Sequence, residues 1–255
     1  MLSSLPASFA AVVHGASRGI GLALVERLLA TSSVEHVIAT ARNPDSEPLA
    51  ALAERSGDRL RRLPMDVTSA GAVAQAAARL REQAVRPHLV LNVVGLLHDA
   101  DRVQPEKRLE DLDAEVLQRV YAVNTIGPAL VLRHFLPLMA NDGKAVFAAL
   151  SARVGSISDN RLGGWYAYRS SKAALNQLMK TASIEARRRY RNLVLASLHP
   201  GTTDTDLSAP FQSNVPAEKL FDAHFVAERL LAVIDGLNTE DSGGFFAWDG
   251  QAVPY

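Results

Sequence analysis

Short apolar runs alternate with longer amphipathic segments along most of the chain. The runs at 9–14, 36–40, 60–65, 89–93, 144–150, 192–198 and 245–248 are rich in Val, Leu and Ala without strict alternation, which predicts strands buried on both faces. Apolar residues at helical spacing predict helices at 20–30, 69–85, 112–140, 164–189 and 216–237. Strands that alternate with helices in this way indicate a parallel sheet wrapped by helices on both faces.

The chain of 255 residues shows no low-complexity linker and no internal repeat. We therefore expect residues 1–255 to form one α/β domain, a doubly wound Rossmann fold with a seven-stranded parallel sheet. The segments 98–110 and 202–215 are expected to be long loops. Long loops at a sheet edge often carry substrate contacts.

Composition excludes several classes of protein. The chain has no Cys, which excludes disulfides and thiolate metal sites, and its seven His show no metal-binding spacing. Lys+Arg and Asp+Glu number 27 each, so no net charge would attract nucleic acid or an anionic membrane. No apolar run approaches the ~18 residues of a membrane span, and no targeting segment precedes the first strand. We expect a cytoplasmic protein that binds no metal, nucleic acid or membrane.

A glycine-rich turn follows the first predicted strand and opens the first helix. It reads His14-Gly15-Ala16-Ser17-Arg18-Gly19-Ile20-Gly21. Closely spaced glycines between a strand and a helix allow the backbone to approach a diphosphate, whose charge then faces the helix N-terminus. The alternative is an ordinary tight turn with close helix packing.

The end of the second strand indicates which dinucleotide is bound. An acid there would accept the ribose 2′-hydroxyl, whereas Arg would bind a 2′-phosphate. The sequence has Arg42 at this place and Arg18 in the glycine turn, with no Asp or Glu at the strand end. Two guanidiniums favour NADP(H) over NAD(H), although each Arg alone would be an ordinary surface charge.

Tyr168 and Lys172 are four residues apart and share one face of a predicted helix. A phenol with a pKa near ~10 transfers protons poorly at neutral pH, and a neighbouring ammonium lowers that pKa. Tyr166 has Ser170 at the same offset, so it lacks such a partner. The alternative places Tyr168 at the edge of the core and Lys172 in solvent.

With these motifs in order, the sequence resembles the short-chain dehydrogenase/reductase family over almost its full length. The matching motifs are Gly15-x3-Gly19-Ile20-Gly21, Asp66-Val67, Asn92-x2-Gly95, Asn124, Tyr168-x3-Lys172 and Pro200-Gly201. Within the family, the stretches 155–157, 163–169 and 243–250 are similar to the C-factor-like and Sniffer-like carbonyl reductase branch.

The resemblance implies hydride transfer between NADP(H) and a carbonyl or alcohol carbon. Tyr168 would exchange the proton, Lys172 would lower the pKa of Tyr168 and hold the nicotinamide ribose, and the Asn124 backbone carbonyl would hold a water. The implied cofactor-binding residues are Gly15, Ser17, Arg18, Gly19, Ile20, Gly21, Arg42, Asp66, Val67, Asn92, Gly95, Lys172, Pro200, Gly201, Thr203 and Thr205. The alternatives are loop capping for the two threonines and a helix kink for Asn124.

The sequence departs from the family pattern at two places. His14 stands where the family usually has Thr, and Ala152 stands three residues before Gly155, where the family has its catalytic Ser. Our hypothesis is that Ser151, one residue away, donates to the substrate oxygen after a local backbone adjustment, with Ser156 as second choice.

The residues expected over the nicotinamide are mostly apolar, which indicates a neutral ketone or aldehyde as substrate. They are Val94, Leu96, Leu97, Trp165, Leu207 and Phe211. Apolar faces at 112–140 and 173–184 suit a homodimer or homotetramer. Two other functions stay open: an NADP(H)-binding regulatory or signalling protein with little turnover, which Ala152 would suit, and an NAD-linked dehydrogenase that oxidises an alcohol.

Overall fold

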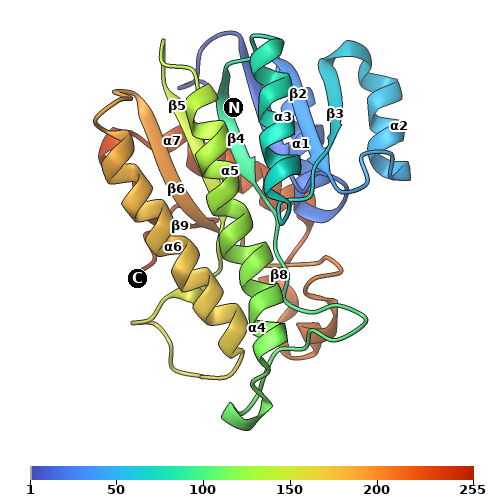
Figure 1. Ribbon diagram of the computed structural model, residues 1–255, viewed down its shortest axis with the longest axis vertical. Helices are drawn as coiled ribbons and strands as arrows, with labels where there is room; N and C mark the ends of the chain where they lie inside the picture. The colour runs from blue at the N-terminus through green and yellow to red at the C-terminus, as the bar shows by residue number, and fades with distance from the viewer. Residues whose placement is uncertain (1) are drawn as a thin grey trace.

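The computed structural model describes residues 2–255, and at its centre is a seven-stranded sheet in which every strand runs parallel to its neighbours (Figure 1). The spatial order is β3-β2-β1-β4-β5-β6-β9. The predicted α/β Rossmann fold and its seven parallel strands are thereby confirmed. The strands are β1 (Phe9–His14), β2 (Val34–Ala41), β3 (Leu60–Pro64), β4 (Pro87–Asn92), β5 (Ala145–Leu150), β6 (Leu193–His199) and β9 (Gly244–Ala247).

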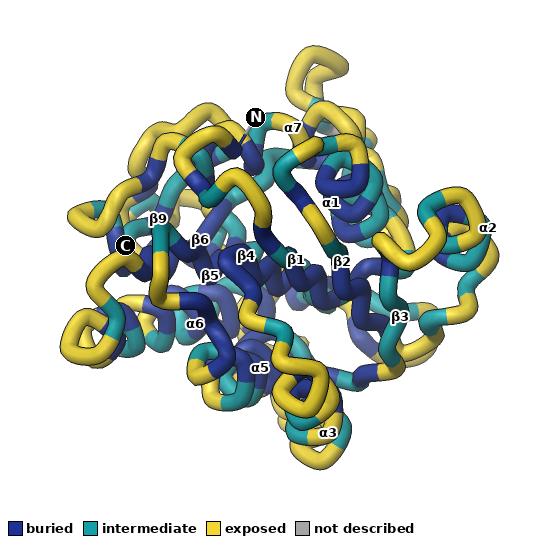
Figure 2. Tube along the Cα trace, turned by 90° about the horizontal axis from the view of Figure 1, so that it is seen from above, coloured by how far each residue is buried: buried dark blue, intermediate teal, exposed yellow. Residues whose placement is uncertain are grey.

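Helices cover both faces of this sheet. The helices α1 (Gly19–Leu29), α2 (Glu47–Ser56) and α7 (Ala223–Gly236) bury apolar side chains against one face. The helices α3 (Ala70–Glu82), α5 (Gly127–Phe135) and α6 (Tyr166–Ala186) cover the other. Figure 2 shows β1, β4 and β5 as buried chain between the two helix layers, which explains why these strands lack an alternating pattern.

The prediction and the structure differ in three parts of the chain. The segment 112–140 is not one regular helix: α4 (Ala114–Tyr121) passes through a π turn (Ala122–Ile126) into α5. The helix α2 was not predicted, because only Leu49 and Leu52 on it are buried and its apolar pattern is weak. The second long loop contains a short strand, β7 (Thr202–Thr203), which pairs with β8 (Leu220–Phe221) at 216–222, where the start of a helix was predicted.

The carboxyl ends of the parallel strands meet at one edge of the sheet. The chain that leaves β4, the start of α4 and the β7–β8 pair all extend beyond this edge, in the lower part of Figure 1. In open α/β sheets, ligands bind outside the carboxyl ends of the strands, where the strand order reverses. Here that point lies between β1 and β4.

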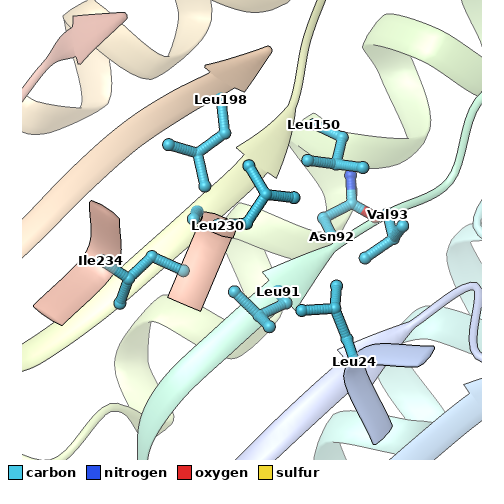
Figure 3. A pocket seen from close by; sticks show the side chains of 9 residues that line it. Leu24, Leu91, Asn92, Val93, Leu150, Leu198, Leu230 and Ile234 are labelled. Carbon is cyan, nitrogen blue, oxygen red and sulfur yellow. The ribbon is translucent and has the colours of Figure 1, made fainter. Parts of the chain in front are cut away.

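A small internal cavity lies between the sheet and the pair α1 and α7. Its volume is about 10 Å³, and the side chains of Leu24, Leu91, Leu198 and Leu230 are among those that surround it (Figure 3). A space of this size with an apolar lining holds neither a substrate nor a well-bound water. It is a minor defect of core packing below the carboxyl edge.

No helix within residues 2–255 is both long and apolar enough to cross a lipid bilayer.

Candidate active site

The glycine turn after β1 leaves room and donors for an anion. Gly15 and Gly19 have left-handed backbone, with φ of +84° and +53°. A Cβ on Gly21 would lie 2.1 Å from the Gly15 carbonyl oxygen, so only glycine permits this close contact. The N-cap residue of α1, Arg18, makes no side-chain cap, and the first turn of the helix holds no acid. The backbone N–H groups at the start of α1 are therefore available to bind an anion. This arrangement fits the diphosphate of a dinucleotide.

His14 replaces the usual threonine beside this turn and is fully buried. Its Nδ1 lies 2.8 Å from Thr40 Oγ1, and its ring meets Phe135 edge-on at 4.5 Å between centroids. Burial lowers the pKa of His14 to about 3, so the imidazole is neutral at physiological pH. The Thr40 carbonyl accepts the N–H groups of Gly15 (2.9 Å) and Ala16 (3.1 Å). The His14 and Thr40 pair therefore fixes the base of the glycine turn.

The two arginines expected at the 2′-phosphate differ in their surroundings. Arg42 follows the last residue of β2 and is exposed. The Arg18 guanidinium forms an ion pair with Asp206 at 2.8 Å, from the segment that follows β7. Thr205, next to Asp206, lies against Gly19, where a Cβ would stand 3.2 Å from Thr205 Cγ2. The segment after β7 therefore packs directly on the glycine turn.

The predicted adenine residues lie at the ends of β3 and β4. Asp66 Oδ1 accepts from the Thr68 backbone N–H (2.9 Å) and hydroxyl (2.7 Å), so a tight turn fixes the carboxylate. Val67 is buried. Asn92 is buried as well, and its Oδ1 has no hydrogen-bond partner in residues 2–255. Such an uncompensated acceptor fits a site that binds a polar ligand.

The segment after β6 brings further polar groups to the same edge. Gly201 has φ of +77° and packs against the Phe221 ring. The buried Thr203 Oγ1 lacks a partner in the described part of the chain, and the Thr205 hydroxyl donates to the Thr203 carbonyl at 3.4 Å. Of the two threonines, Thr203 is thus the one whose hydroxyl makes no hydrogen bond to the described residues.

Tyr168 and Lys172 lie one turn apart on α6, as predicted. Lys172 Nζ is 5.7 Å from the centre of the Tyr168 ring and donates to the Leu150 carbonyl at 2.8 Å. The exposed fractions are 9% for Tyr168 and 2% for Lys172. An ammonium has three donors, and Leu150 uses one of them.

The pKa values of this pair depend mainly on burial. Burial raises the pKa of the Tyr168 phenol, and it lowers the pKa of Lys172 to about 8. The net shift of the Tyr168 pKa is thus upward, because desolvation disfavours the charged form of a buried group. The lowering of this pKa by Lys172, which the family resemblance implies, stays a prediction.

Asn124 connects the segment after β4 to α6. Its Oδ1 accepts the Leu96 N–H at 2.7 Å, and its Nδ2 donates to the Leu96 carbonyl (2.8 Å) and to Ser171 Oγ (3.1 Å). The side chain lies in the π turn, a geometry that is common at functional sites. A Cβ on Gly95 would lie 3.7 Å from Lys172 Nζ and 3.8 Å from Asn124 Oδ1. Gly95, Lys172 and Asn124 therefore lie close together.

The serines after β5 differ in how their hydroxyls are used. Ser151 is buried, its N–H donates to the Leu198 carbonyl at 2.8 Å, and its Oγ has no partner among the described residues. Ser156 is also buried, but its Oγ accepts the Asp159 N–H at 3.2 Å. Ala152 has no side-chain donor. Ser151 is therefore the serine with an uncommitted hydroxyl.

Aromatic side chains lie beside Tyr168. The Trp165 ring lies 6.3 Å from that of Tyr168 and 5.1 Å from that of Phe211. The His98 ring, which the sequence did not indicate, packs edge-on against Phe211 at 5.5 Å, and its Nε2 contacts the Asp206 carbonyl. Leu207 reaches the same place, 3.8 Å from a Cβ on Gly95. The expected apolar lining is thus partly assembled around Trp165, Leu207 and Phe211.

The predicted site residues lie at the carboxyl edge of the sheet, on α6 or, for Asn124, in the π turn between α4 and α5. Asp66 follows β3, Arg42 follows β2, the glycine turn follows β1, and Ser151 follows β5. Within residues 2–255, no three His, Asp or Glu side chains come together in a way that could hold a metal ion.

Comparison with known proteins agrees with this geometry. Residues 10–216 match the family model described as short chain dehydrogenase. Over 147 residues, which cover 58% of this chain and 83% of the relative, the sequence is 37% identical to the C-signal protein of Myxococcus xanthus.

Two solved structures share the fold over nearly the whole chain. An NADPH-bound carbonyl reductase from chicken fatty liver has a TM-score of 0.86 and 28% identity, and the match covers 99% of this chain and 97% of that one. The carbonyl reductase Sniffer of D. melanogaster has a TM-score of 0.85 and 25% identity, with coverage of 97% and 100%.

Proposed function

Since the chain belongs to the short chain dehydrogenase family, we propose that it is an oxidoreductase that uses NADPH to reduce a small, mostly apolar ketone or aldehyde. The predicted family is confirmed, and the similarity to C-signal and Sniffer agrees with the predicted branch. The observation that carries the proposal is the buried Tyr168 and Lys172 pair, one turn apart on α6 and beside the carboxyl edge that holds the glycine turn.

NADPH, when bound, would supply the hydride. The amides at the start of α1 and the glycine turn would hold its diphosphate, and Arg42 with Arg18 would hold its 2′-phosphate. The two N–H groups of Lys172 that Leu150 does not use would bind ribose hydroxyls. The side-chain amide of Asn92 and the hydroxyl of Thr203 would bind further polar groups of the cofactor.

Tyr168 would deliver the proton to the substrate oxygen as the carbonyl carbon is reduced. The phenol is protonated at neutral pH and so carries the proton that reduction requires. With a pKa of about 8, Lys172 is still mostly protonated at pH 7 and stabilises the phenolate that remains after the transfer.

The hydroxyl of Ser151 would donate to the substrate oxygen in place of the serine that Ala152 replaces. Its Oγ is unpartnered, whereas Ser156 already binds Asp159. A donor of this kind stabilises the negative charge that develops on the oxygen.

The same proposal includes the cytoplasmic location and the homo-oligomer expected from the sequence. Ile126, beside α5, and Ile184, on α6, are large apolar residues exposed by 53% and 56% on the two segments predicted to form the seam between copies.

The test is NADPH oxidation on a panel of small ketones and aldehydes by the wild type, Tyr168→Phe and Tyr166→Phe. Tyr166 is the matched control, because it lies on the same helix but is exposed. We expect Tyr168→Phe to lose turnover by about 10²- to 10⁴-fold and Tyr166→Phe to keep it. NADPH binding without turnover on any carbonyl compound would instead support the regulatory alternative.

A further inference from the structure

The segment between β4 and α4 is ordered by three acidic side chains. Asp99 Oδ1 accepts the N–H groups of Arg102 and Val103, each at 2.8 Å. At the other end, Asp111 Oδ2 accepts the N–H groups of Lys107 (3.3 Å) and Arg108 (3.0 Å). We name residues 99–111 the strap. Asp111 binds only the strap itself, whereas Asp99 also forms an ion pair with Arg119 of α4 at 2.8 Å. The attachment of the strap to α6 therefore depends on the residues between these two acids.

Glu106, in the middle of the strap, binds the beginning of α6. Its Oε2 accepts the Ala167 N–H at 3.2 Å, and its backbone carbonyl accepts the Trp165 N–H at 2.5 Å. The exposed fraction of Glu106 is 5%. Two amides at the N-terminus of α6 are therefore bound by one residue that lies 61 positions earlier in the chain.

The helix α6 has no local substitute for this contact. Its N-cap residue, Trp165, is in the left-handed region (φ 54°, ψ 45°) and makes no side-chain cap, and the first turn contains no acid. Unpartnered amides at a helix start attract an acceptor, and the 21-residue helix adds the positive end of its dipole. Glu106 supplies that acceptor from a distance.

A buried carboxylate is costly unless it is well bound. The other oxygen of Glu106, Oε1, has no hydrogen-bond partner in the described chain. A purely apolar contact between the strap and α6 would avoid this cost. The presence of the Glu106 carboxylate therefore points to a task that needs a directional hydrogen bond at the start of α6.

The residue that this hydrogen bond affects most directly is Tyr168, which follows Ala167 in the chain. The Ala167 side chain is buried in a small apolar cluster with Val103 of the strap and Val116 and Val120 of α4. The Trp165 ring packs against Tyr168. A shift of the first turn of α6 would therefore move the phenol relative to the other residues of the proposed active site.

We propose that Glu106 is a positioning residue for Tyr168: through its bond to the Ala167 amide it fixes the first turn of α6 and so the place of the phenol. The expected effect on catalysis rests on the proposed reductase function, whereas the expected effect on the first turn of α6 does not. A displacement of reacting groups by a fraction of their separation is enough to cost about ten- to a hundredfold in turnover.

Three substitutions separate the reach of the side chain from its charge. Glu106→Gln keeps the oxygen that accepts from Ala167 but removes the charge, whereas Glu106→Asp keeps the charge but is one methylene too short. Glu106→Ala removes both. We expect kcat to remain within about threefold in the Gln variant and to fall about ten- to a hundredfold in the Asp and Ala variants. The Kd for NADPH should be unchanged in all of them, because the glycine turn is not touched. Glu110→Gln, an exposed acid of the same strap, is the control.

Hydrogen exchange of the Trp165 and Ala167 amides provides the second measurement and needs no turnover. We expect exchange to accelerate at least about tenfold in the Asp and Ala variants but not in the Gln variant, with amides in the middle of α6 unchanged. Full activity in Glu106→Asp with loss in Glu106→Gln, or unchanged exchange in Glu106→Ala, would overturn the proposal. If the wild type reduced no carbonyl compound, the reductase function would fail while the exchange result still decided the role of Glu106.

Discussion

Arg42 is the residue on which the choice of dinucleotide depends most directly. It is exposed at the end of β2, whereas Arg18 is already paired with Asp206. A phosphate that binds Arg18 must compete with that carboxylate, so the charge of Arg42 is the more available of the two.

We expect Arg42→Ala to raise the Kd for NADPH about tenfold, because it removes one charge-assisted contact to the 2′-phosphate. The Kd for NADH should change little. Titration of the reduced nicotinamide fluorescence measures both values. Arg55→Ala, an exposed Arg on α2, controls for net charge. An equal loss for both cofactors, or a wild type that binds NADH as well as NADPH, would contradict the assignment.

The serine assignment is tested at three neighbouring positions. We expect Ser151→Ala to lower turnover by at least about 10²-fold and Ser156→Ala to have little effect, since the Ser156 hydroxyl is engaged by Asp159. Ala152→Ser, which restores the family residue, should add little if Ser151 already donates. A large gain of kcat in Ala152→Ser together with an inert Ser151→Ala would place the missing donor at position 152.

The residues that the sequence located are those fixed by local backbone. Gly15 and Gly21 stand in a strand–turn–helix unit, and Tyr168 and Lys172 share one helix face, so spacing alone predicts their places. The sequence did not indicate the upward shift of the Tyr168 pKa, because burial depends on the whole fold. The sequence likewise gave no indication of Glu106, whose partner is 61 positions away.

At the scale of the elements, β5 and α7 are joined to the N-terminal segment by one partly exposed polar cluster. Lys144 Nζ, just before β5, donates to the Ile234 and Asp235 carbonyls (3.0 and 2.8 Å) at the end of α7. The Asp235 carboxylate accepts the N–H groups of Ser3 (3.1 Å) and Ser4 (2.8 Å). The ammonium thus satisfies helix carbonyls that have no partner within the helix.

Replacement of Lys144 by Met should lower the free energy of unfolding by about 1–3 kcal/mol, because the two carbonyls lose their donor. Urea unfolding followed by circular dichroism gives the value. Lys219→Met, at an exposed position, is the control and should have little effect. A Lys144→Met variant as stable as the wild type would show that water replaces the ammonium.

The strands were easier to predict than the helices. Each is an apolar run buried between two helix layers, and burial on both faces leaves a strong signal in the sequence. The π turn at Ala122–Ile126 leaves no such signal, since its residues fit a regular helix equally well. The order within the strap arises from side chains that bind backbone amides, which a hydrophobic pattern does not report.

At the scale of the whole molecule, stability depends on pH through two buried imidazoles. Burial lowers the pKa of His14 to about 3 and that of His199 to about 4, from 6.5. In the unfolded chain both bind a proton below about pH 6.5, whereas the folded chain binds none until much lower pH. The unfolded state therefore holds more protons in this window, and the free energy of unfolding falls as the pH falls.

His14 alone should account for about 2 kcal/mol of the stability lost between pH 7 and pH 5. His14→Asn keeps a polar group beside Thr40 but does not titrate, so its loss over the same range should be smaller by that amount. Urea unfolding at the two pH values measures the difference, and His224→Asn, at an exposed position, is the control. Parallel losses in His14→Asn and the wild type would mean that His14 is protonated without unfolding.

The order of the elements along the chain also means that the two halves of the proposed active site are synthesised at different times. The glycine turn and β1 to β3 leave the ribosome first, and β1 later pairs with β4, so the nucleotide half precedes the half that carries the phenol. The residues proposed to hold the diphosphate and the 2′-phosphate are therefore synthesised well before Tyr168 on α6.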